Sequence, residues 1–105
     1  MTEKVFNIDL NDGTRSLKFD NHAIYRFEEI QGESAVNVIV RGLTSVRTIN
    51  HFIWAGLLHE SPNITITEVI NLVDTHRMQE YANIISTAID HALDSGKRDL
   101  AKKKQ

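Results

Sequence analysis

The stretch 4–19, KVFNIDLNDGTRSLKF, decides the fold class because it predicts a β-hairpin ahead of an otherwise helical chain. Apolar residues alternate with polar ones on both arms, as in strands with one buried face: Phe6, Ile8 and Leu10 on the first, Leu17 and Phe19 on the second. Between the arms, Asp12-Gly13 predicts a type I′ turn, because both central residues of that turn need a positive φ. A lone hairpin is marginally stable, so we expect its apolar face to pack on the helices that follow.

The remainder of the chain predicts five helices, at about 21–31, 34–42, 45–59, 66–76 and 78–94. Favourable N-cap residues stand at the start of the first four: Asp20 or Asn21, Ser34, Thr44 or Ser45, and Thr65. Thr65 and Glu68 have the spacing of a capping box. The last helix has the clearest pattern, with apolar residues at steps of three and four from Met78 to Leu93. The second is rich in β-branched residues, so a strand is the competing interpretation of 34–42.

These elements predict an α+β fold in which an N-terminal hairpin (4–19) packs on a mainly helical assembly of four or five helices. A chain of 105 residues accommodates one hydrophobic core, so we expect a single domain over 5–96. Residues 97–105 are basic and have little to bury, and we expect them to form a flexible tail.

Composition narrows the classes of partner. The formal net charge of −2 and the pI near 6.2 give no overall attraction for nucleic acid. No window approaches 18 consecutive apolar residues, so no membrane partner is expected. The stretch MTEKVFNIDL lacks a basic region followed by an apolar core, so we expect no signal peptide and a cytoplasmic location. The absence of cysteine excludes disulfides and thiolate chemistry.

Residues capable of catalysis or metal binding are scattered along the sequence. Five histidines fall on five separate stretches without the paired spacing of a zinc site: His22, His51, His59, His76 and His91. The adjacent Glu28 and Glu29 would point about 100° apart on a helix. No serine lies in a GxSxG-like turn, and isolated glycines cannot form a phosphate loop. We therefore expect no enzyme, no metal, no cofactor and no small-molecule substrate.

A helix-turn-helix is the alternative for the stretch 65–89, TITEVINLVDTHRMQEYANIISTAI, with DTHR as the turn. The second helix of such a motif presents basic and polar residues at its N-terminus. Here the corresponding helix begins MQEYANII, which would not attract phosphates. A small DNA-binding regulator is therefore retained only as the second function.

The stretch 52–59, FIWAGLLH, contains more apolar residues than one buried stripe needs. Phe52, Ile53 and Leu57 fit an inner face, whereas Trp54 and Leu58 form a second stripe at i, i+4. One interpretation is a central helix buried on several sides. The other is an exposed Trp54–Leu58 stripe that binds a partner, because tryptophan is enriched at binding hot spots.

Taken in order, the elements resemble the tail assembly chaperones of long-tailed bacteriophages, prophages and gene-transfer agents. The resemblance covers about residues 5–96 and is carried by these stretches: LNDGTRSLKF, NHAIYRFEEIQG, IWAGLLHES, ITITEVINLVD and YANIISTAIDHALDSG. None of them is a catalytic signature.

The resemblance implies a non-enzymatic role in the cytoplasm of a bacterial host. Such chaperones bind the tape-measure protein, keep its helical segments soluble and help tail-tube subunits polymerise around it. Many are also made in a longer, frameshifted form, and the lysines of AKKKQ are consistent with a slippery run of codons. The resemblance leaves the oligomeric state and the client segment open.

Overall fold

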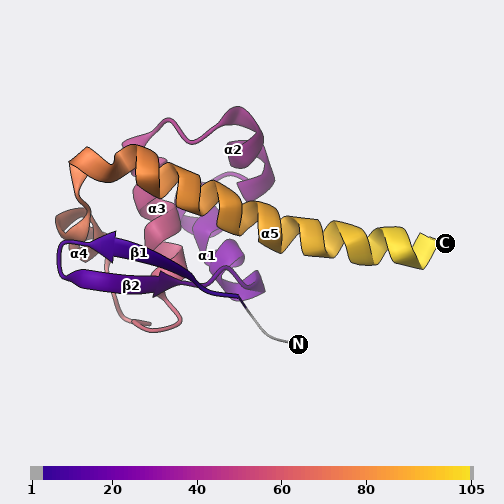
Figure 1. Cartoon of the computed structure of the whole chain (residues 1–105), viewed down its shortest axis with the longest axis horizontal. Coiled ribbons are helices and arrows are strands. Elements are labelled where there is room, and N and C mark those ends of the chain that lie inside the picture. Colours follow the sequence, from indigo (N-terminus) through magenta and orange to yellow (C-terminus); the bar gives the residue numbers. More distant parts are fainter. Residues whose placement is uncertain (1–3, 105) are drawn as a thin grey trace.

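The computed structural model describes the backbone of residues 4–104 and the side chains of residues 4–93. It confirms the α+β class: a two-stranded antiparallel hairpin is followed by helices that enclose one core (Figure 1). The elements are β1 (Phe6–Leu10), β2 (Gly13–Leu17), α1 (Asn21–Gln31), α2 (Ala35–Arg41), α3 (Val46–Leu57), α4 (Ile66–Leu72), the short 3-10 helix η1 (Thr75–Arg77) and α5 (Met78–Lys104). None of the helices in the described part of the chain is long and apolar enough to cross a membrane.

The hairpin has the expected strands but not the expected turn. Phe6 pairs with Leu17 and Leu10 with Gly13, which leaves Asn11 and Asp12 as the two connecting residues. Of the described residues only glycines have a positive φ, and in the hairpin this is Gly13, at +125°. The prediction of a type I′ turn at Asp12-Gly13 was therefore wrong, because neither connecting residue adopts the backbone that this turn requires.

Helix α3 is the centre of the core and contacts α1, α4, α5 and β2. Phe52 stacks on Phe27 of α1 with ring centroids 3.7 Å apart. On another side of the helix, Gly56 lies against the hairpin, and its carbonyl accepts a hydrogen bond from the Lys18 backbone N–H at 3.0 Å. The hairpin thus buries its apolar face on α3. An isolated hairpin is only marginally stable, so this packing is needed for it to form.

Residues 34–42 form helix α2 rather than the alternative strand. The Ser34 hydroxyl accepts the Asn37 N–H at 3.0 Å, and the Glu28 carboxylate of α1 accepts the Ala35 N–H at 2.7 Å. These acceptors satisfy N–H groups that a helix start leaves without partners. Burial of Ala35 and Val38 against the core then outweighs the modest helix propensity of the valines.

Two helix boundaries differ from those expected. The predicted helix 66–76 ends at Leu72, because Val73 is extended and the Asp74 carboxylate accepts the His76 N–H at 2.9 Å to start a new turn. The predicted helix 78–94 is longer: α5 continues to Lys104 and projects beyond the other elements (Figure 1). The side chains of the predicted basic tail, 97–105, lie outside the described residues.

Candidate protein-binding surface

Trp54 and Leu58, the two residues expected to bind a partner, are covered by the chain itself. Trp54 is only 8% exposed, and its indole N–H donates to the Ile64 carbonyl oxygen at 2.9 Å. The Arg26 guanidinium of α1 lies 5.5 Å from the centroid of the tryptophan ring. Leu58, just after α3, is half-buried and packs against the core.

The exposed Trp54–Leu58 stripe expected for docking is therefore not formed, and the central-helix interpretation describes α3. Both neighbours of the indole come from outside α3: the Ile64 carbonyl in the segment before α4 accepts its N–H, and Arg26 of α1 lies over its ring. A pattern within α3 alone cannot reveal either neighbour.

The histidines do not assemble a metal site in the described part of the chain, where no group of three or more possible ligands comes together. His51 hydrogen-bonds Gln31 at 2.7 Å through Nδ1. Burial lowers the pKa of His51, and the nearby charge of Arg47 lowers it further. His91 packs edge-on against Phe6, with ring centroids 6.2 Å apart. These contacts place each of the two rings in a packing role.

Ser16, His59 and Glu60 lie together but do not form a nucleophile and its base. Nε2 of His59 lies 3.1 Å from the Ser16 hydroxyl and 3.0 Å from the Ser16 carbonyl oxygen. A carbonyl only accepts, so Nε2 carries the hydrogen and cannot take a proton from the hydroxyl. The Glu60 carboxylate accepts the Ser16 backbone N–H at 3.0 Å, and this bond is the main cause of its lowered pKa. The three residues fasten β2 to the connection after α3.

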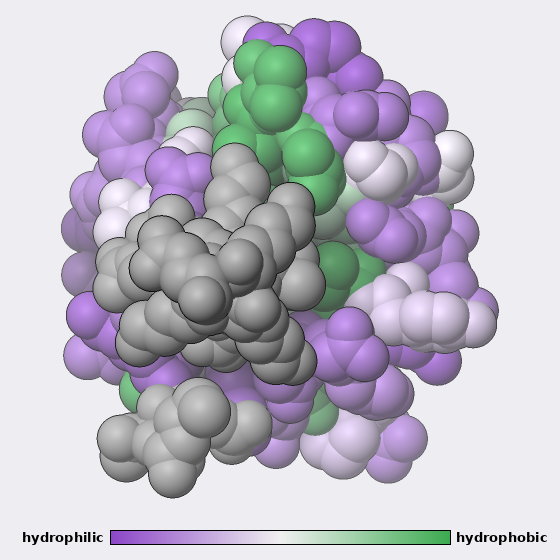
Figure 2. Space-filling model, turned by 90° about the vertical axis from the view of Figure 1, so that its right-hand side faces the viewer, coloured by the Kyte–Doolittle hydropathy of each residue, from purple (hydrophilic) through white to green (hydrophobic). Residues whose placement is uncertain are grey.

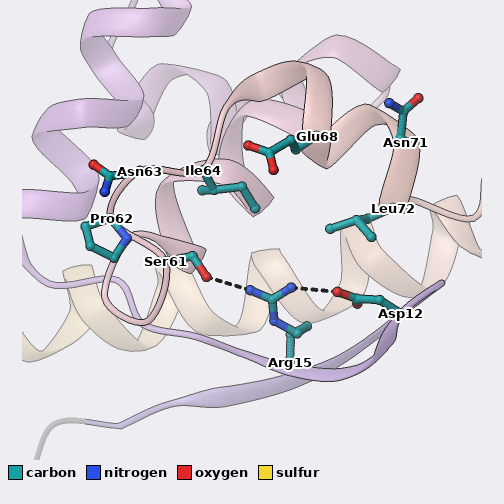
Figure 3. A pocket seen from close by; sticks show the side chains of 9 residues that line it. All are labelled: Asp12, Arg15, Ser61, Pro62, Asn63, Ile64, Glu68, Asn71 and Leu72. Carbon is teal, nitrogen blue, oxygen red and sulfur yellow. Dashed lines mark hydrogen bonds and ion pairs between the residues drawn. The ribbon is translucent and has the colours of Figure 1, made fainter.

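A surface pocket of about 630 Å³ lies between the hairpin, the loop 61–64 and α4 (Figure 3). Arg15 points into it and donates to Asp12 at 2.9 Å and to Ser61 at 2.8 Å, while Glu60 lies 3.5 Å from its Nε. The Glu68 carboxylate on the opposite wall accepts the Thr65 N–H of the capping box at 2.9 Å. The charged groups of the pocket are thus engaged in joining the elements around it.

The charges at the predicted turn of the helix-turn-helix argue against DNA binding. Arg77, the cation nearest the start of α5, lies 3.4 Å from Asp9, 3.7 Å from Asp74 and 3.4 Å from Glu80. Three carboxylates around one guanidinium give this end of α5 an acidic surface. Such a surface repels the phosphates that a recognition helix must approach.

Among the large apolar side chains in the described part of the chain, the most exposed is Val40 on α2. Val36 and Val40 are 50% and 83% exposed, and Val46 at the start of α3 is 53% exposed. Half of the six large apolar side chains that are exposed in the described part of the chain thus fall within residues 36–46. Figure 2 shows an apolar patch in the region where Figure 1 places α2, on the side from which α5 projects. An apolar surface of this kind is a candidate site for binding another protein.

The sequence contained a signal for this surface. Val36 and Val40 are four residues apart, which places them on one side of a helix, while the buried Ala35 and Val38 lie on the other. In the competing strand interpretation Val36, Val38 and Val40 would share one face, so only the helix separates the two exposed valines from the buried Val38.

Comparison of the chain with family models, with curated proteins and with solved structures finds no match.

Proposed function

We propose that the protein is a phage or prophage tail assembly chaperone, which acts in the bacterial cytoplasm by binding the tape-measure protein and promoting tail-tube assembly. The sequence resemblance suggests this role, and the exposure of Val36 and Val40 on α2 is the observation that supports it. A chaperone of this kind needs an apolar surface that stays accessible in its own folded state, and these two valines provide one.

Helical client segments suit such a surface. An amphipathic helix binds a partner through apolar anchors at i, i+3, i+4 and i+7, which two valines one turn apart can contact together. Burying the remaining exposed part of the two valine side chains would contribute about 2–4 kcal/mol, since fully burying one valine contributes about 1.5–3 kcal/mol.

Co-expression with a candidate tape-measure protein tests the proposal, with recovery of soluble tape-measure protein as the readout. We expect the wild-type chain to keep the client soluble and the double variant Val36→Glu, Val40→Glu to lose most of this effect. Ile70→Glu is the control, because Ile70 is an apolar residue on α4 whose exposure, 54%, is close to that of Val36. Equal recovery with the double variant and the wild type would contradict the proposal.

A further inference from the structure

We draw no further inference here: the strongest candidate, the exposed apolar face of α2 around Val36 and Val40, is already the surface on which the proposed function rests, and nothing in the described part of the chain shows what covers it.

Discussion

At the scale of single residues, Gly56 controls how the hairpin joins the core. A Cβ atom at this position would lie 3.0 Å from Cβ and Cδ2 of Leu17 and 3.0 Å from Cζ of Phe19. Leu17 cannot yield by a rotamer change alone, because its Cβ is fixed to the backbone of β2. Glycine therefore permits the close approach of the hairpin here, because a Cβ would force Leu17 or Phe19 to move by a few tenths of an ångström.

We expect Gly56→Ala to lower the free energy of unfolding by about 1–3 kcal/mol, the usual cost of overpacking a core. Urea denaturation followed by circular dichroism measures the change. Thr87→Ala, at an exposed position of α5, should shift it by less than about 0.5 kcal/mol. A Gly56→Ala variant as stable as the wild type would show that the hairpin can move away from α3 at no cost.

At the scale of elements, the sequence-based predictions were correct where a feature depends on residues within one turn. They failed where it depends on residues far away in the sequence. N-caps such as Asp20 and Ser34, and the Thr65–Glu68 capping box, depend on neighbours within one turn and were placed correctly. The end of α4 depends on the backbone of Val73, which no helix pattern specifies. The candidate surface was misplaced on Trp54 because its cover comes from segments remote from α3.

The ion pair between Glu33 and Arg41, at the junction between α1 and α2, makes the stability of the fold depend on pH. The hydrogen bonds from Arg41 are the main cause that lowers the pKa of Glu33 from 4.5 to about 2, with a further bond from Gln31. A carboxyl with a depressed folded-state pKa stabilises the fold above its unfolded value and loses this contribution as pH falls. The stabilisation is thus complete above about pH 4.5 and declines towards pH 2.

We expect an NMR titration to give Glu33 a pKa near 2 in the wild type and a higher pKa in Arg41→Gln, which the remaining bond from Gln31 keeps below the ordinary 4.5. Arg47→Gln serves as the control, because it removes an exposed guanidinium of α3 that is not among the causes of the Glu33 shift. A pKa that Arg41→Gln leaves unchanged would mean that the ion pair does not persist in solution.

At the scale of the whole molecule, the two ends of the described fold are joined through Tyr81. Its hydroxyl donates to the Asp9 carbonyl oxygen of β1 at 2.9 Å and accepts the Asp74 N–H at 3.2 Å. The side chain is fully buried, so β1, the segment before η1 and α5 share one polar link inside the core. This link makes the hairpin part of the same cooperative unit as the last helix.

Tyr81→Phe removes the link while keeping the ring, and it leaves the Asp74 N–H and the Asp9 carbonyl without this partner. An unsatisfied buried polar group costs about 1–3 kcal/mol, so we expect the free energy of unfolding to fall by at least about 1 kcal/mol. Circular dichroism and the fluorescence of Trp54, the single tryptophan, should report the same lowered urea midpoint. Separate midpoints would instead show that the surroundings of Trp54 on α3 unfold independently of the bulk of the helices once the link is lost. Unchanged client binding by the variant at low temperature would then place Tyr81 in the stability of the fold, apart from the α2 surface.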